Sequence, residues 1–335
     1  MAQVLLLSAA HAKDEDDYNH GAFRKLRESA MSDPFCAHTL TNDPAAADVI
    51  VFAELYGAGP YFEAVRQHPF VKKFREKCFL FCSNDFVIPF LPGIYASIEK
   101  RWSSARTCSG FYLGVSENEF VTVTPCADGL PYLYSFVGAV TNAPIRRQLQ
   151  ALTHPRSIFH DTSEDYQLAL YKKFNAQEEH DYWQRYATIS KASKFILCPR
   201  GRGVSSVRLF DAMRMARVPV ILSDEWVEPI GPCWEQFSIR VREKDFARVP
   251  DLLEMREAEA PQMGRLARAQ WEEWFSGQVC FHRVIEWCLL IKQRRWLPER
   301  WARFLPYIEY LRPFHFRHLL RTRFQAWKKT AALKP

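Results

Sequence analysis

Residues 194–224 constrain the fold of this 335-residue chain more than any other stretch. An apolar run at 195–198 stops at Pro199, a loop of sequence Arg-Gly-Arg-Gly follows at 200–203, and a second apolar run occupies 218–222. Ser205 and Ser206 favour a helix start, because their hydroxyls can cap its first turn. Apolar residues then recur at helical spacing up to position 216. The stretch is therefore predicted to be a strand, a glycine loop, a helix and a parallel strand.

The charges of the same stretch suit an anionic ligand. The loop amides, the helix N-terminus and the guanidinium groups of Arg200, Arg202 and Arg208 could converge on a phosphate. Open parallel sheets bind ligands at the carboxyl ends of their strands, where this loop lies. Asp211 follows Arg208 by one turn and could accept hydrogen bonds from a ribose. A nucleotide diphosphate fits both features, and an exposed ion pair between Arg208 and Asp211 is the alternative.

Three runs of this stretch resemble the signature of the exostosin family, glycosyltransferase family 47. They are Phe195-Ile-Leu-Cys-Pro-Arg-Gly, Ser205-Ser-Val-Arg-Leu-Phe-Asp-Ala and Val218-Pro-Val-Ile-Leu-Ser-Asp. The resemblance implies the donor-binding half of a GT-B fold and an inverting transfer of sugar from a nucleotide sugar, a UDP-sugar, to a glycan hydroxyl. The donor-binding residues that follow are Arg146, Arg200, Gly201, Arg202, Gly203, Ser205, Ser206, Arg208, Asp211 and Asp224.

The chain departs from the family pattern at two places. Asp211 stands where the family usually has Glu, and Met215-Ala-Arg217 stands where a Gly often precedes the second strand. Trp226, just after that strand, is expected either to stack on the base of the nucleotide or to lie in the core.

Strands and helices alternate along the whole chain, which predicts an α/β fold of two Rossmann-like domains facing a cleft, the GT-B arrangement. Strands are expected at 4–10, 48–53 and 78–82, with helices at 21–31 and 61–77 between them, and the second sheet begins at 132–137. We predict an acceptor-side α/β domain over 1–127, a nucleotide-sugar-binding α/β domain over 128–291, and a basic helical tail over 292–335.

An inverting transfer needs a base that removes the proton of the acceptor hydroxyl. His11, Glu54 and Asp85 each follow an apolar strand at its carboxyl end, and Asp85 is our choice. A cap or loop hydrogen bond is the alternative for each. The aromatic segment 89–95, with Trp102 and Tyr112, is expected to border the acceptor or to pack as an ordinary loop.

Arginines are expected to stabilise the departing diphosphate in place of a metal ion, with Arg208 as the catalytic member. Arg146 lies in the first turn of a predicted helix, where the macrodipole disfavours cations, so it needs another role. The resemblance implies that it reaches the donor. No metal and no cofactor are predicted; the acidic run 14–16 matches a D-x-D metal pattern, but a solvated loop is the preferred interpretation.

The tail has a different composition. Residues 292–335 carry 12 Lys and Arg against two Glu, a balance of +10, whereas the whole chain is +7. Aromatic residues are interleaved with these cations, which suits a return onto the first domain or contact with an anionic membrane surface. Nucleic-acid binding is the third alternative, but no recognition motif accompanies it.

A non-catalytic partner that only binds a nucleotide sugar or a glycan is the main rival to an enzyme. No apolar run is long enough to span a membrane, and the run 4–7 is too short for a signal peptide. Nine cysteines without a regular framework indicate reduced thiols. We therefore expect a cytoplasmic protein whose tail either returns onto the first domain or makes peripheral membrane contact.

Overall fold

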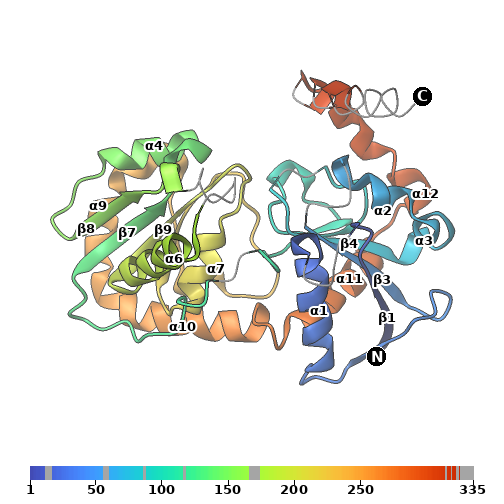
Figure 1. Ribbon diagram of the computed structural model, residues 1–335, viewed down its shortest axis with the longest axis horizontal. Coiled ribbons are helices and arrows are strands. Elements are labelled where there is room, and N and C mark those ends of the chain that lie inside the picture. Colours follow the sequence, from blue (N-terminus) through green and yellow to red (C-terminus); the bar gives the residue numbers. More distant parts are fainter. Residues whose placement is uncertain are drawn as a thin grey trace.

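The computed structural model describes residues 1–11, 17–55, 60–85, 88–115, 118–165, 174–313, 315–317, 319–321 and 324. Within this part of the chain the strands form two sheets, each of which is parallel throughout and covered by helices (Figure 1). The predicted fold class, two parallel α/β sheets, is confirmed. All nine cysteines are free thiols.

The first sheet has the strand order β2-β1-β3-β4-β5-β6. Its central strands are continuous apolar runs buried along their whole length, as expected for a sheet with helices on both faces. The strands are β1 Ala2–Leu7, β2 His38–Leu40, β3 Val49–Glu54, β4 Cys78–Cys82, β5 Gly93–Tyr95 and β6 Thr107–Ser109. The connecting helices are α1 Gly21–Met31, α2 Glu63–Gln67 and α3 Pro69–Lys73. Pro69 is the first residue of α3, so it divides the helical segment predicted at 61–77.

The second sheet has the order β11-β10-β9-β7-β8. Its strands are β7 Tyr132–Gly138, β8 Ser157–Asp161, β9 Ser193–Pro199, β10 Val218–Leu222 and β11 Ile239–Arg240. Its helices are α4 Pro144–Gln148, α6 Ala176–Lys191, α7 Val207–Arg214, α8 Trp234–Phe237 and α9 Val249–Met255. The described chain also has short 3-10 segments at Tyr18–His20, Pro60–Phe62, Arg75–Lys77, Lys100–Trp102, Val140–Asn142, Leu149–Ala151, Glu243–Arg248, Glu257–Glu259 and Leu305–Leu311.

The predicted strand–loop–helix–strand unit is confirmed as β9, α7 and β10. The two strands pair in parallel from Phe195 and Val218 onward. Ser206 occupies the N-cap of α7 in an extended conformation, although its side chain makes no capping hydrogen bond.

The end of α7 explains how the chain manages without the family's glycine. The Arg217 N–H donates to the Ala212 carbonyl over 2.8 Å, and the Ala216 N–H donates to the Met213 carbonyl over 3.1 Å. This pattern is a Schellman motif, in which the residue after the C-cap is left-handed and usually glycine. Ala216 takes that place with φ 58°.

Replacing Ala216 by glycine is therefore expected to stabilise the fold by about 0.5–1 kcal/mol. A left-handed non-glycine residue costs roughly 1–2 kcal/mol, and the added flexibility of the unfolded chain returns roughly 0.4–1 kcal/mol of that gain. Urea unfolding measures the change. Ala212→Gly, inside the same helix, is the control and should lose about 1 kcal/mol. A destabilised Ala216→Gly variant would contradict this account of the turn.

Two long helices, α10 Ala260–Trp274 and α11 Cys280–Arg294, run beneath both sheets (Figure 1). α10 packs on α7, β9 and β10 of the second sheet, whereas α11 packs on α1, β3, β5 and β6 of the first. Most of α11 lies in the range 128–291, which was predicted to be the second domain, and its last three residues lie in the predicted tail, yet the helix covers the first sheet. An amphipathic helix pattern shows which face is buried but not which sheet buries it.

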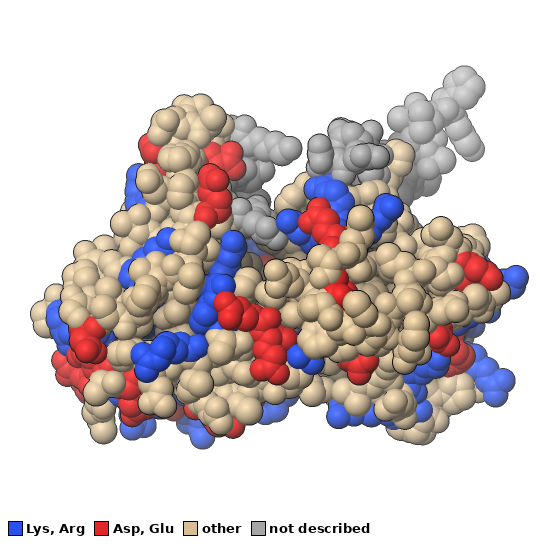
Figure 2. Space-filling view, turned by 90° about the horizontal axis from the view of Figure 1, so that it is seen from below, with Lys and Arg blue, Asp and Glu red and all other residues tan. Residues whose placement is uncertain are grey.

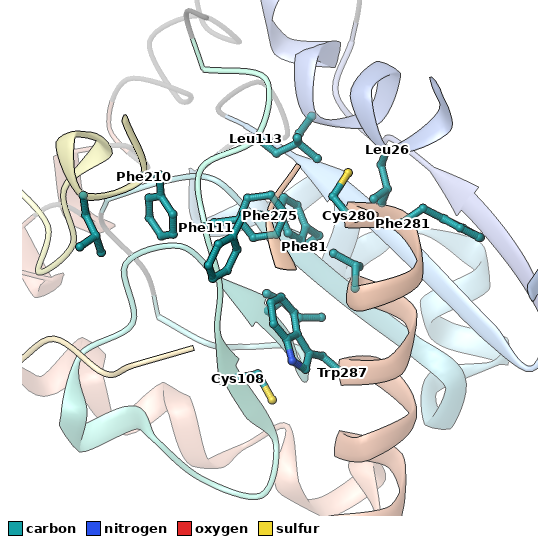
Figure 3. Packing of buried hydrophobic residues seen from close by; sticks show 14 of the residues in the cluster. Leu26, Phe81, Cys108, Phe111, Leu113, Phe210, Phe275, Cys280, Phe281 and Trp287 are labelled. Atoms are coloured by element: carbon teal, nitrogen blue, oxygen red, sulfur yellow. The ribbon is translucent and has the colours of Figure 1, made fainter. Parts of the chain in front are cut away.

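One aromatic cluster joins the two halves of the molecule (Figure 3). The ring centroids of Phe111 and Phe275 are 5.4 Å apart, those of Phe210 and Phe275 are 5.2 Å apart, and Trp287 lies 6.3 Å from Phe111. These rings come from the first sheet's region, from α7 and from the helices beneath. The hydrophobic core is therefore continuous between the two sheets.

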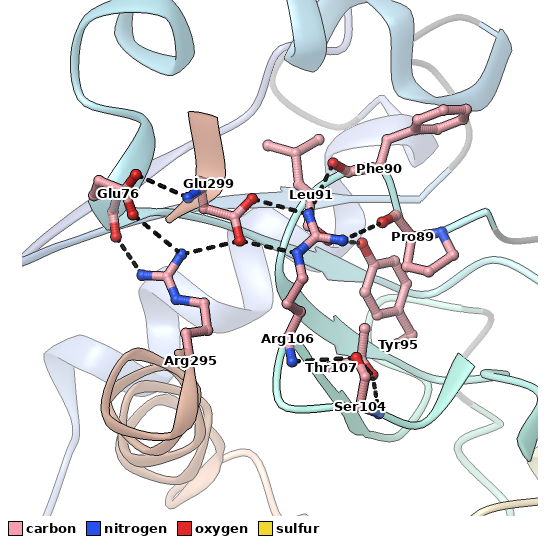
Figure 4. Close-up of polar contacts among 10 residues, drawn as sticks. All are labelled: Glu76, Pro89, Phe90, Leu91, Tyr95, Ser104, Arg106, Thr107, Arg295 and Glu299. Atoms are coloured by element: carbon pink, nitrogen blue, oxygen red, sulfur yellow. Dashed lines mark hydrogen bonds and ion pairs between the residues drawn. The ribbon is translucent and has the colours of Figure 1, made fainter. Parts of the chain in front are cut away.

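The residues after α11 return to the first sheet. Glu299, at the start of α12 Glu299–Ala302, accepts two hydrogen bonds of 2.9 Å from Arg106 (Figure 4). Arg101 pairs with Glu309 over 3.1 Å, and the rings of Tyr61 and Tyr310 are 5.5 Å apart. None of the described helices is long and apolar enough to cross a membrane.

Candidate functional site

The Arg-Gly loop touches the first domain at the carboxyl ends of its strands. A Cβ on Gly203 would lie 2.8 Å from the Asp85 carbonyl oxygen and would collide with Ser97 Oγ, so only glycine fits there. The Ser205 N–H donates to Ser97 Oγ over 3.1 Å. Asp85 follows β4 and Ser97 follows β5. Residues after strands of both sheets therefore meet at this loop.

Asp85 is held in place by a tyrosine. The Tyr112 hydroxyl donates to Asp85 Oδ1 over 2.7 Å. Burial raises the pKa of Asp85, and the Tyr112 hydrogen bond together with the charges of Arg146 and Arg202 opposes this rise. A carboxylate made more basic by burial is suited to accept a proton. Asp85 thus lies beside the loop, in contact with Tyr112, which was expected either to border the acceptor or to pack as part of an ordinary loop.

Arg208 and Arg146 flank the same aromatic ring at the end of β7. The guanidinium carbon of Arg208 is 5.3 Å from the Phe136 centroid, and that of Arg146 is 5.7 Å from it. Arg208 Nε donates to the Val137 carbonyl over 2.5 Å, and a Cβ on Gly138 would collide with the Arg208 guanidinium. Gly138 therefore makes room for Arg208 beside the strand end.

The position of Arg146 in the first helical turn has a structural reason. The residue is buried, and its guanidinium donates to the carbonyls of Ala139 over 3.1 Å, Pro199 over 3.3 Å and Arg200 over 2.9 Å. These carbonyls offset the unfavourable macrodipole. The same bonds hold the start of the Arg-Gly loop against the end of β7.

Arg200 and Asp224 are joined through a residue that the sequence did not reveal. Arg200 Nε donates to Glu243 Oε1 over 2.9 Å, and the Glu243 N–H donates to Asp224 Oδ1 over 3.1 Å. The Arg200 charge is therefore already paired within the protein. Arg202 is exposed beside Gly201 and Gly203. Of the predicted arginines, Arg146 and Arg208 thus lie at the end of β7. Arg200 is in the ion pair with Glu243, and Arg202 is at the surface of the loop.

Asp211 has a partner from α6. The Tyr186 hydroxyl donates to Asp211 Oδ2 over 2.8 Å. Burial raises the pKa of Asp211 to about 6, although the Tyr186 bond and the charge of Arg208 lower it. Within the described part of the chain no ion pair forms between Arg208 and Asp211, so the exposed-pair alternative is wrong.

Trp226 is a core residue. It is buried and meets Trp234 edge-on at 5.1 Å. Its ring is not available to stack on a nucleotide base, and the core alternative is correct. The acidic run 14–16 lies outside the described residues.

The other two candidate bases have different surroundings. His11 is exposed. Glu54, at the end of β3, accepts from the Ala9 N–H over 2.6 Å and from Ser8 Oγ over 3.1 Å. Burial raises the pKa of Glu54 from 4.5 to about 7.

Glu54 predicts a pH-dependent stability. A carboxyl group whose pKa is raised by folding binds its proton more tightly in the folded than in the unfolded chain. Its contribution is therefore present below pH 4.5 and is lost as the pH rises towards 7. The full effect is roughly 3 kcal/mol. Urea unfolding at a series of pH values should show this decline in the wild type and a flatter curve in Glu54→Gln, which mimics the protonated group. Parallel curves for the two proteins would contradict the assignment.

Residues 128–255, which include this loop, match the model of the Exostosin GT47 domain. The resemblance predicted from the sequence is confirmed over that range.

Three curated relatives are named exostosin or probable glycosyltransferase. The Exostosin-1 homolog of Caenorhabditis elegans is 37% identical over 78 residues, which cover 23% of this chain and 20% of the relative. Exostosin-1 of Drosophila melanogaster is 33% identical over 93 residues, covering 27% of this chain and 12% of the relative. A probable glycosyltransferase of Arabidopsis thaliana is 30% identical over 132 residues, covering 39% of this chain and 24% of the relative. The matched segments thus span less than a quarter of each relative.

Two solved structures resemble the chain over most of its length. MurG of Acinetobacter baumannii has a TM-score of 0.39 and 12% identity, and the match covers 88% of this chain and 100% of that chain. Anabaena Alr3699/HepE in complex with UDP has a TM-score of 0.38 and 8% identity, and the match covers 85% of this chain and 99% of that chain. Both TM-scores are below 0.5, so these likenesses carry no argument about function.

Proposed function

We propose that the protein is an inverting glycosyltransferase that moves a sugar from a nucleotide sugar, a UDP-sugar, to a hydroxyl of a glycan. The observation that carries the proposal is the contact between the Arg-Gly loop of an exostosin domain and Asp85 of the other sheet. In this proposal Asp85 is the base, and the loop amides beside it bind the diphosphate.

In the proposed reaction the donor diphosphate lies on the loop amides, Arg202 and Arg208. The acceptor oxygen attacks the anomeric carbon from the face opposite the nucleotide, and Asp85 takes the hydroxyl proton. The bond from the anomeric carbon to the phosphate oxygen breaks as the new glycosidic bond forms. The electron pair leaves with the diphosphate, where the guanidinium groups stabilise the developing charge.

Three further residues have positioning roles in this proposal. Tyr112 orients Asp85, Arg146 fixes the loop through three carbonyls, and Tyr186 fixes Asp211, which would accept the ribose hydroxyls. The reaction as proposed uses no metal ion and no cofactor.

Thermal unfolding with a panel of nucleotide sugars tests the donor assignment. A ligand that binds only the folded protein raises its melting temperature. UDP and one UDP-sugar are expected to raise it, whereas uridine, which lacks the diphosphate, should have little effect. Slow release of UDP without acceptor would identify an enzyme. Binding without release would support the non-catalytic partner, and no response to any nucleotide would reject both.

We also propose that the tail makes peripheral contact with an anionic membrane, such as the cytoplasmic leaflet. Trp296 and Leu311 are 83% and 80% exposed, and Arg300, Arg312 and Arg317 are exposed among them. Apolar and basic groups together suit an anionic lipid surface. On the face drawn in Figure 2, by contrast, acidic and basic groups are interspersed among the coloured residues, so this face offers no continuous basic surface for a nucleic-acid backbone.

Vesicle co-sedimentation tests the membrane contact. We expect binding to vesicles that contain phosphatidylserine and little binding to pure phosphatidylcholine, with the difference reduced by salt. Replacing Trp296 and Leu311 together by serine should weaken binding without unfolding the protein, because both side chains are exposed. Equal binding by this variant and the wild type would contradict the proposal.

A further inference from the structure

Three potential metal ligands lie together between an edge strand and a helix of the first domain. His38 is the first residue of β2, while His282 and Glu286 lie four residues apart on one face of α11. One ligand atom from each residue lies within 4.8 Å of the other two. His38 Nε2 is 3.1 Å from Glu286 Oε1, and the two imidazole centroids are 5.1 Å apart.

Two imidazole nitrogens of this cluster lack the hydrogen bonds that buried polar groups require. The His38 side chain is 2% exposed; its Nε2 faces the Glu286 carboxylate at 3.1 Å, whereas its Nδ1 has no hydrogen-bond partner among the described residues. His282 Nδ1 is also buried without a hydrogen-bond partner in that part of the chain. A buried polar atom without a partner costs about 1–3 kcal/mol. Two such nitrogens in one place call for a further binding partner.

A carboxylate from the preceding loop lies near the same point. Asp33 Oδ2 is buried without a hydrogen-bond partner among the described residues, and its charge acts on both imidazoles. The Phe35 ring stacks on His282 at 4.1 Å and fixes the plane of that imidazole. The amino terminus is one neighbouring cation, since its charge lowers the pKa of His38. Another, Arg283, stacks on Trp274 at 4.0 Å and lies 3.8 Å from the carboxylate of Glu273. Its charge is thus partly compensated away from the cluster.

We propose that His38, His282 and Glu286 bind a divalent transition-metal ion of the zinc type. Two imidazole nitrogens and a carboxylate oxygen are ligands that zinc accepts, and an ion bonded to them would satisfy the unpaired nitrogens. The bound ion would join strand β2 to helix α11.

The position of the site favours a structural role. His38 pairs with Ala2 at the start of β1, so the cluster lies at the amino ends of the parallel strands. Asp85 and Ser97 follow the carboxyl ends of β4 and β5 in the same sheet. The proposed ion is therefore on the opposite edge of the sheet from the candidate site, and the inference does not rest on the proposed transferase activity.

Titration of the untagged full chain with Zn²⁺ tests the site. Calorimetry should show one ion per chain, thermal unfolding should shift upward with Zn²⁺, and Co²⁺ in its place should give the intense visible absorption of a tetrahedral ion. Glu286→Gln removes one ligand from a half-exposed position and is expected to weaken zinc binding at least about tenfold.

A matched control exists in the second domain. His154 Nε2 lies 2.8 Å from Glu254 Oε1, and Glu254 is about as exposed as Glu286, but no third ligand gathers at this pair in the described structure. Glu254→Gln should bind zinc as the wild type does. Absence of zinc binding by the wild type, or equal zinc affinity in Glu286→Gln and the wild type, would overturn the proposal.

Discussion

Replacing Arg208 by alanine is expected to lower donor turnover by about a hundredfold to a thousandfold, the effect of removing one preorganised group from a developing negative charge. Its guanidinium lies beside the Phe136 ring and the Val137 carbonyl at the end of β7. We propose that the leaving diphosphate binds next to it. The initial rate of nucleotide release at saturating donor and acceptor measures the change.

The Arg208→Ala experiment needs a control for packing, because Arg208 also donates a hydrogen bond to Val137. Losing that bond should cost about 1 kcal/mol of stability, which far-UV circular dichroism and thermal unfolding can verify. Arg214 lies on the same helix, 5.9 Å from the Trp271 ring and outside the site. Arg214→Ala should keep wild-type turnover. Wild-type turnover in Arg208→Ala would reject the proposed role of this arginine and the diphosphate site with it.

Glu299→Gln is expected to destabilise the fold by about 3–5 kcal/mol, the usual effect of removing one partner from a buried ion pair. The Glu299 side chain is 1% exposed and faces two arginines, Arg106 with two contacts of 2.9 Å and Arg295 at 3.3 Å (Figure 4). The neutral amide would leave both guanidinium groups with less compensation. Arg295 retains a contact with the Glu76 carbonyl at 2.6 Å, which favours the lower end of the range.

Urea unfolding of Glu299→Gln should be compared with that of Glu272→Gln. Glu272 is 57% exposed and pairs with Arg268 one turn away on α10. An exposed pair of this kind contributes about 0.3–0.5 kcal/mol. Similar losses in the two variants would mean that water reaches the Glu299 network and that the returning tail contributes little to the first domain.

Long elements with a clear apolar pattern were predictable from the sequence. Helix α1 and strands β4 and β10 have the predicted bounds, because each is delimited by local signals. The edge strands β2 and β6 were missed, since three residues are too few to show a period and their pairing is decided by distant segments. Most of helix α11 was assigned to the wrong half, because an amphipathic pattern does not show which sheet buries the helix.

The candidate site was predictable where one local segment supplies it. Arg208 and the glycine loop follow from the strand–loop–helix pattern and its resemblance to the exostosin signature. Ser97, Tyr186 and Glu243 have no comparable signal, because each meets the loop or α7 only through contacts between residues far apart in the chain. At Ala216 the sequence showed that a glycine of the family pattern is missing. It did not show that Ala216 adopts the left-handed conformation that ends α7.

The shared aromatic core limits how far the two halves can move apart. Pulling one sheet from the other would bring Phe111, Phe210 and Phe275 into water, at about 1.5–3 kcal/mol for each ring. Small bending leaves these rings covered, whereas wide separation does not. Exchange of ligands at the Arg-Gly loop would then depend on rearrangement of nearby connecting segments, with the two sheets moving essentially as a single body.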